Sequence, residues 1–131
     1  MITDVISFTI VVRDQDEALA FYVDKLGFEK RADQPMGNGL RWVTVAPQHA
    51  NVVFVLQPLA WFEGEEREER QRRIGKGPTT VLRVDDCHGT SAMLRERGVK
   101  ITQEPTKTFY GVEANIADLY GNTLVLLEQQ M

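Results

Sequence analysis

An internal repeat is the sequence feature that most limits how this chain can fold. Asp14 precedes Gly27 by 13 positions, and Asp85 precedes Gly98 by the same 13, at an offset of 71 residues (85 − 14). An Asp that caps a helix and a Gly that follows its last turn account for both pairs. A sequence that replays one pattern at a fixed offset is built from copies of a single supersecondary unit.

A second match lies at the end of each copy. The same offset places residues 51–57 (NVVFVLQ) on residues 122–128 (NTLVLLE), with apolar positions on apolar positions and a polar residue at the end of each. Apolar, β-branched runs of this length predict buried strands. Two separate matches at one offset therefore predict a duplicated unit.

Each copy is predicted to contain a strand, a helix and then three more strands. In the first copy, the β-branched residues 5–12 predict a buried strand, and a helix that starts at Asp14 or Asp16 follows. In the second copy, a strand at residues 80–84 precedes a helix that starts at residues 85–86. The other expected strands cover residues 28–31, 41–45, 52–56, 99–102, 112–117 and 123–127.

The expected fold class is α+β. One helix can cover only one face of a four-stranded sheet, so the two copies must pair, within one chain or across a dimer. We therefore expect two βαβββ modules whose curved mixed sheets surround a central cavity. With 131 residues the chain is long enough for one such domain.

The single domain, residues 1–131, is expected to divide into two modules and a connector. Module 1 covers about residues 1–57, the charged connector about 58–77 and module 2 about 78–131. Glu and Arg alternate in the connector at helical spacing, as in Glu66–Arg70 and Glu69–Arg73, which is typical of a solvated helix. Trp61 and Phe62 precede this run, and either pack over the mouth of a cavity or belong to the connector.

Charge and cysteine content exclude several classes of protein. The net charge of −4 argues against a nucleic-acid partner, which requires a basic face. Cys87 is the single cysteine, so an intramolecular disulfide is impossible. The apolar runs are too short to span a membrane, and the first residues lack the basic start of a signal peptide. We therefore expect a cytoplasmic protein with no membrane partner.

Two motifs resemble those of the glyoxalase/bleomycin-resistance/dioxygenase (vicinal oxygen chelate) superfamily. Residues 12–28 match its N-terminal pattern V-x-D-x-x-x-A-x-x-F-Y-x-x-x-L-G-F. Residues 110–114 and 118–122 resemble its closing Y-G and D-P-x-G-N motifs, with Leu119 where proline is usual. The resemblance covers essentially the whole chain and implies the fold expected above. In the bleomycin-resistance branch, it also implies a homodimer whose chains exchange units to form two equivalent cavities.

The resemblance also indicates where a metal ligand would lie. Superfamily enzymes hold one divalent metal with His or Glu from the first and last strands of each unit. The matching positions here are Ser7, Phe54, Thr79 and Val125, with Val55 as the alternative to Phe54. None of these side chains is a usual metal ligand. His49 and His88 fall in a turn and near a helix start, so we expect no metal and no other cofactor.

The expected cavity is mostly apolar, with a few polar groups. Strand alternation and nearby aromatic residues give the candidates for its lining: Ser7, Thr9, Trp42, Phe54, Leu56, Trp61, Thr79, Arg83, Phe109, Tyr110 and Val125. Arg83 either pairs with an anionic ligand group or with a neighbouring Asp. The aromatic residues either stack on a planar ligand or fill the core.

The function expected from this pattern is the binding of a small organic molecule, an antibiotic or a metabolite, by a homodimer without metal. No nucleophile–base pair or phosphate-binding loop is visible, so no catalytic residue is assigned. One alternative is a metal-dependent lyase, isomerase or ring-cleaving dioxygenase with non-standard ligands. Another is a structural partner whose cavity its own side chains fill.

Overall fold

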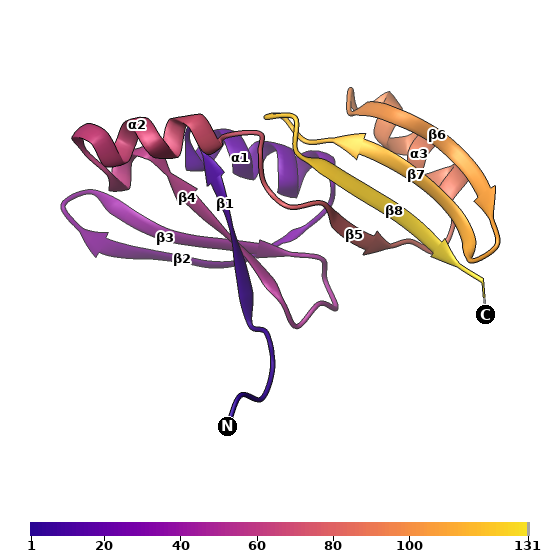
Figure 1. Cartoon of the computed structure of the whole chain (residues 1–131), viewed down its shortest axis with the longest axis horizontal. Helices are drawn as coiled ribbons and strands as arrows, with labels where there is room; N and C mark the ends of the chain where they lie inside the picture. The colour runs from indigo at the N-terminus through magenta and orange to yellow at the C-terminus, as the bar shows by residue number, and fades with distance from the viewer. Residues whose placement is uncertain (131) are drawn as a thin grey trace. The chain divides into compact units, whose positions relative to one another are not determined.

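The computed structural model describes residues 1–130, which form two compact units, residues 1–74 and residues 75–130 (Figure 1). Each unit holds one four-stranded mixed sheet, of order β1-β4-β3-β2 in the first and β5-β8-β7-β6 in the second. In each, the first strand runs parallel to the last, and the other pairs are antiparallel. The predicted α+β fold of two βαβββ modules is confirmed.

The first unit contains the predicted strands and helix, and a further helix follows them. Its elements are β1 (Ser7–Val12), α1 (Gln15–Leu19), η1 (Ala20–Lys25), β2 (Glu29–Gly37), β3 (Leu40–Ala46), β4 (Val53–Pro58), η2 (Leu59–Trp61) and α2 (Gly64–Arg73). The strand predicted at 28–31 is longer than expected and includes Pro35. Because β2 lies at the edge of its sheet, a residue without an N–H is tolerated there.

The helix of the first unit begins at Asp14, whose carboxylate accepts a hydrogen bond from the Glu17 backbone N–H at 2.8 Å. After one α-helical turn it continues as the π-helical segment η1. It ends before Gly27, which has a φ of 80° that favours glycine. A π-helical turn holds one more residue than the α-helical turn it replaces.

Tyr22 lies at the centre of the first unit's core and is fully buried. Its ring contacts Phe21, Phe28 and Phe54 at centroid separations of 5.3, 5.4 and 5.8 Å. Phe54 also contacts Phe8 at 4.3 Å. The helix therefore covers the face of the first sheet that carries Phe54, and aromatic edges fill the space between them.

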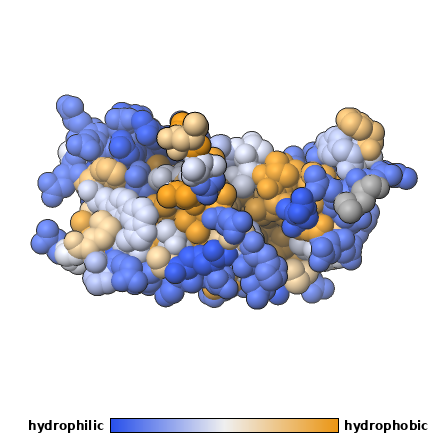
Figure 2. Space-filling view, turned by 90° about the horizontal axis from the view of Figure 1, so that it is seen from below, coloured by the Kyte–Doolittle hydropathy of each residue, from blue (hydrophilic) through white to orange (hydrophobic). Residues whose placement is uncertain are grey.

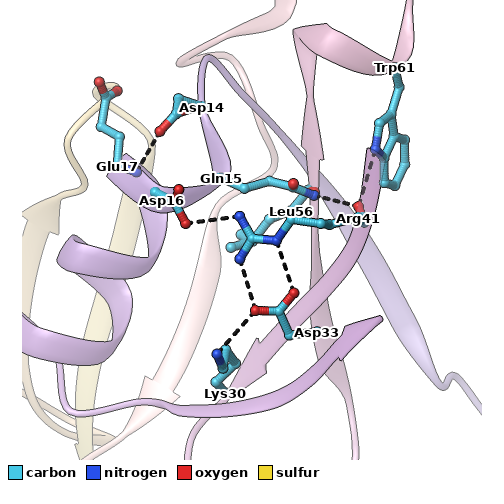
Figure 3. A network of polar contacts seen from close by, with 9 residues as sticks. All are labelled: Asp14, Gln15, Asp16, Glu17, Lys30, Asp33, Arg41, Leu56 and Trp61. Carbon is cyan, nitrogen blue, oxygen red and sulfur yellow. Dashed lines mark hydrogen bonds and ion pairs between the residues drawn. The ribbon is translucent and has the colours of Figure 1, made fainter. Parts of the chain in front are cut away.

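A polar network fixes this helix to three strands (Figure 3). Arg41 of β3 makes two hydrogen bonds to the Asp33 carboxylate of β2, at 2.8 and 3.0 Å, and a third to Asp16 at 2.9 Å. The buried side chain of Gln15 donates to the backbone oxygens of Arg41 and Leu56, at 2.8 and 3.1 Å. Charge-assisted, bidentate pairs of this kind are among the stronger polar contacts in proteins.

The predicted connector helix is present as α2, and its residues are mostly exposed. Arg73 pairs with Glu69 as its spacing predicts. Arg70 does not pair with Glu66 as expected. Its guanidinium instead lies 3.7 Å from the Glu69 carboxylate and 4.5 Å from the centre of the Phe62 ring. Within residues 1–130, no helix is both long enough and apolar enough to cross a membrane.

The second unit repeats the plan of the first with a regular α-helix. Its elements are β5 (Thr80–Arg83), α3 (Cys87–Glu96), β6 (Lys100–Thr108), β7 (Gly111–Ala117) and β8 (Thr123–Gln129). The cap of α3 is Asp86, whose carboxylate accepts from the Gly89 N–H at 3.0 Å. Asp85, which the repeat had placed opposite Asp14, does not cap the helix. Strand β6, like β2, is a longer edge strand than predicted and includes a proline.

The position of this cap changes the sequence alignment of the two copies of the repeat. Asp14 corresponds to Asp86, an offset of 72 (86 − 14), whereas the helix-ending Gly27 and Gly98 differ by 71. The π-helical turn accounts for the extra residue of the first helix. The repeat is therefore real, but its offset changes along the chain.

The offset changes again before the last strand. Thr9 pairs with Val55, and its counterpart Val81 pairs with Val125, so the last strands correspond at an offset of 70 (125 − 55). Phe54 is thus the counterpart of Leu124, and Val55 that of Val125. Because side chains alternate between faces, a shift of one residue moves a side chain to the other side of the sheet.

The closing motif at residues 118–122 is a hydrogen-bonded turn. Asp118 Oδ1 accepts from the N–H groups of Tyr120 and Asn122, and its Oδ2 accepts from the Asn122 side chain. Asn122 Oδ1 accepts in turn from the Gly77 N–H at 2.8 Å. Asp118 and Asn122 are both buried, so this motif connects the entry to β5 with the turn before β8.

Replacing Asn122 with Ala should lower the free energy of unfolding by about 1–3 kcal/mol, because it removes the two buried hydrogen bonds that the Asn122 side chain makes, to the Asp118 carboxylate and to the Gly77 N–H. Urea unfolding followed by circular dichroism measures the change. Asn51→Ala, at an exposed position, is the control and should change stability by less than about 0.5 kcal/mol. Equal effects of the two substitutions would contradict the role given to the turn.

The Arg41 pair should make stability depend on pH. Hydrogen bonds from Arg41 and Lys30 hold the pKa of Asp33 well below its usual range. A carboxylate whose pKa is depressed in the folded state stabilises the fold above its unfolded pKa, about 4, and loses this contribution as the pH falls further. Asp33→Asn should therefore flatten the loss of stability below about pH 4 in urea unfolding at a series of pH values. The Asp33→Asn/Arg41→Gln double variant should lose stability below about pH 4 no less steeply than Asp33→Asn alone. A still flatter pH dependence in the double variant would contradict the pairing of Asp33 with Arg41.

Candidate functional site

Each sheet has its module's helix on one face only. In the second unit, α3 contacts β7 and β8, and Leu94 of the helix and Ile116 and Leu124 of these strands are all buried. The Cys87 thiol lies on the same side, 3.6 Å from the Leu126 carbonyl oxygen. This face is a hydrophobic core and is unavailable to a ligand.

The other side, which we call the open face of the second sheet, carries apolar side chains flanked by polar ones. Its residues are Val81, Arg83, Glu113, Asn115, Thr123, Val125 and Leu127. The register aligns them in rows across β5, β8 and β7. Val81 is 59% exposed, and Val125 and Leu127 are half-buried. Figure 2 shows apolar side chains reaching the protein surface, bordered by polar ones.

Neutral partners hold the polar groups of this open face in place. Arg83 donates two hydrogen bonds to Gln129 Oε1, at 3.1 and 2.8 Å. Asn115 donates to Gln103 Oε1 at 3.1 Å. At the tip of the β6–β7 hairpin, a hydrogen bond to the Glu113 carboxylate raises the pKa of Tyr110, since ionising the phenol would place two negative charges together.

The open face of the first sheet carries Thr9, Trp42, Thr44, Val53, Val55 and Gln57, which the register places on one side. Thr44 and Val55 of this face are buried, at 4% and 3% exposed. At one end, the indole of Trp61 stacks on Trp42 with a centroid separation of 5.8 Å and an interplanar angle of 8°. The Trp61 N–H donates to the Arg41 carbonyl at 3.2 Å. Arg70 of α2 donates to Gln57 at 3.3 Å. Residues after β4 thus cover part of this face.

A surface hollow of about 430 Å³ borders Trp61, together with Leu40, Phe62, Glu63 and Glu66. Small-molecule sites commonly have volumes of this order. One side of the Trp42–Trp61 stack therefore lies at the rim of a space large enough for a small organic group.

Most of the predicted lining residues lie on open faces or at their edges. Ser7, Thr9 and Trp42 belong to the open face of the first sheet, and Arg83 and Val125 to that of the second. Thr79 is exposed just before β5. Phe109 and Tyr110 form the hairpin tip, where Phe109 is 93% exposed and their rings are 4.9 Å apart.

Phe54 and Leu56 lie elsewhere, and the structure corrects their predicted orientation. Ser7 pairs with Val53 and Thr9 with Val55, so the residues that share a face with Ser7 are the odd-numbered ones of β4. Phe54 and Leu56 are 3% and 0% exposed, on the helix side. The prediction used a constant offset of 71 between the two copies, whereas the last strands correspond at an offset of 70. A difference of one residue moves a side chain to the other face of the sheet.

Sequence reasoning did not include Glu113 or Asn115 in the lining. Both lie on β7, beside Leu127 and Val125 of β8. Their alternation with the buried Ala114 and Ile116 is visible in the sequence, but only the strand register shows which residues of β8 they accompany.

The positions that the superfamily uses for metal ligands do not fit a divalent metal here. With the corrected register they are Ser7, Val55, Thr79 and Val125, which offer only hydroxyl and hydrocarbon groups. No three His, Cys, Asp or Glu side chains within residues 1–130 lie close enough together to hold a metal ion. His49 lies in a turn and His88 in the first turn of α3, and both are exposed.

Cys87 does not have the character of a reactive thiol. It is fully buried, and this burial raises the pKa of the thiol. A cysteine nucleophile needs a lowered pKa and access to its substrate. Cys87 therefore belongs to the core beneath α3.

Known proteins are similar to this chain in fold and in sequence. Residues 5–126 match the model of the Glyoxalase/Bleomycin resistance protein/Dioxygenase superfamily. The crystal structure of UcmS2 is 38% identical and has a TM-score of 0.85, with 98% of this chain and 100% of that chain covered. TnmS3, an antibiotic binding protein from Streptomyces sp. CB03234, is 36% identical with a TM-score of 0.81, with 98% of each chain covered.

An uncharacterised protein of Bacillus subtilis (strain 168), YurT, is also similar. It is 38% identical over 125 residues, which cover 92% of this chain and 95% of that protein. The family match and these likenesses extend over nearly the whole chain and agree with the repeated βαβββ fold. The chain belongs to the Glyoxalase/Bleomycin resistance protein/Dioxygenase superfamily.

Proposed function

We propose that this protein binds a small organic molecule, of the antibiotic or metabolite class, against its open sheet faces without a metal. The observation that carries the proposal is the open face of the second sheet. There, Val81, Val125 and Leu127 are exposed or half-buried beside polar groups that are held in place. Ligand sites typically combine an apolar surface with a few such polar groups.

Contact with a ligand would remove apolar surface of these side chains from water, at roughly 25 cal/mol per Å². The arginine, carboxylate and amide beside them then orient the ligand, because each hydrogen-bonds only at certain positions. In the first unit, the Trp42–Trp61 stack offers an aromatic surface as well.

The likeness to TnmS3 supports the class of ligand. TnmS3 is described as an antibiotic binding protein, and it is 36% identical to this chain over nearly the full length of both. The hydroxyl and hydrocarbon side chains at the metal-ligand positions support binding without a metal. We further propose a cytoplasmic homodimer, because each open apolar face needs a cover and two-fold dimers are the commonest oligomers.

A panel of antibiotics that includes bleomycin and planar aromatic compounds tests the proposal by thermal unfolding. A ligand at 100 times its Kd stabilises the native state by about 2.7 kcal/mol, which is a clear rise in Tm. Val125→Glu should remove this rise because it places a charge on the apolar face. Met93→Glu, on α3, is the matched control and should retain it. A panel that never raises Tm, or a rise that Val125→Glu leaves intact, would contradict the proposal.

Elemental analysis of protein purified without chelator tests the metal-free part separately. We expect no stoichiometric transition metal and no rise in Tm with added Zn²⁺, Ni²⁺, Mn²⁺ or Fe²⁺. About one metal per chain with such a rise would instead favour a lyase, isomerase or ring-cleaving dioxygenase that uses ligands at other positions.

A further inference from the structure

We propose that the open face of the second sheet selects an amphoteric ligand, with an apolar body, an anionic group that binds Arg83 and a cationic group that binds Glu113. The inference rests on the proposed binding function and names the chemistry of its ligand.

The strand register fixes the arrangement of the two charges. Leu127 of β8 pairs with Arg83 of β5 on one side and with Glu113 of β7 on the other. Directly paired residues point to the same side of a sheet. Neighbouring strands lie about 4.8 Å apart, so the backbones of Arg83 and Glu113 are separated by about 10 Å. A basic and an acidic side chain therefore flank an apolar floor that Leu127 and Val125 form.

Neither charge is neutralised by the protein. None of the ion pairs within residues 1–130 includes Arg83 or Glu113. Arg83 bonds to the neutral amide of Gln129, and Glu113 to the neutral phenol of Tyr110. Elsewhere in the same unit, Arg95 and Glu104 do form an ion pair. The open face thus keeps one positive and one negative group for an external partner.

When a ligand covers this face, the two charges determine which ligands bind well. A bound organic molecule excludes water from both groups, and a buried charge without a partner is costly. A ligand with one charge satisfies one group and leaves the other unpaired. A ligand with opposite charges at its two ends satisfies both, so binding discriminates by penalising the singly charged molecules.

The aromatic hairpin tip adds a side wall to this arrangement. Tyr110 approaches Glu113 through its hydroxyl, and the Phe109 ring meets the Tyr110 ring edge-on. Phe109 is almost fully exposed, so it has ring surface to offer a planar ligand. The end of the site beside Glu113 therefore suits a cationic group attached to an aromatic ring.

Isothermal titration calorimetry with four probes of one shape tests the inference: biphenyl methanol, biphenyl carboxylate, biphenyl methylamine, and biphenyl with a carboxylate on one ring and an aminomethyl group on the other. The amphoteric probe should bind the full-length protein at least tenfold more tightly than any other. Arg83→Gln should remove the gain from the carboxylate, and Glu113→Gln the gain from the amine. Each substitution keeps a polar side chain of similar size.

Arg95→Gln and Glu96→Gln on α3 are the matched controls, because they make the same charge changes on the helix that covers the opposite face. Both should retain the preference for the amphoteric probe. If biphenyl methanol binds as tightly as the amphoteric probe, the inference is wrong and the proposed binding function stands. If all four probes fail to bind while an antibiotic in the panel does, the inference is again overturned. If neither probes nor antibiotics bind, both proposals fail.

Discussion

A four-stranded sheet has two faces, but each module supplies only one helix, after its first strand, to cover them. The rest of the structure depends on this constraint. In the first unit, Tyr22 and its aromatic neighbours close the helix side. In the second, Cys87 and Leu94 do so. The remaining face of each sheet keeps apolar side chains that the module's own helix leaves uncovered. Recognition of a small molecule requires no new element in such a protein, only a choice of side chains on that face.

The repeat was enough to predict the architecture, because strand and helix signals recur in the same order in both halves. It was not enough to predict which face of its sheet each side chain occupies. The π-helical turn of the first helix and a further residue before β4 each change the offset by one. Such changes leave the order of elements intact but reverse the faces of a strand. This is why Val125 lies on the open face as predicted, whereas its supposed partner Phe54, predicted for the same lining, lies on the helix side.

The candidate site was accessible from sequence only in part. Arg83 follows from alternation within β5, a short strand that starts two residues after the Gly-Pro at 77–78. Glu113 depends on the pairing of β7 with β8, and one-dimensional patterns do not fix which residue lies beside which. The closing motif of the superfamily proved to be structural, since Asp118 and Asn122 are occupied with backbone groups and with each other.

The positions of the two tryptophans have a consequence for spectroscopy. Trp42 and Trp61 both belong to the first unit, where they stack, and the second unit contains none. Intrinsic tryptophan emission therefore reports the integrity of the first unit alone, whereas far-ultraviolet circular dichroism reports both. Two unfolding curves that coincide would mean that the halves melt as one cooperative system, and two that separate would resolve an intermediate with one half intact.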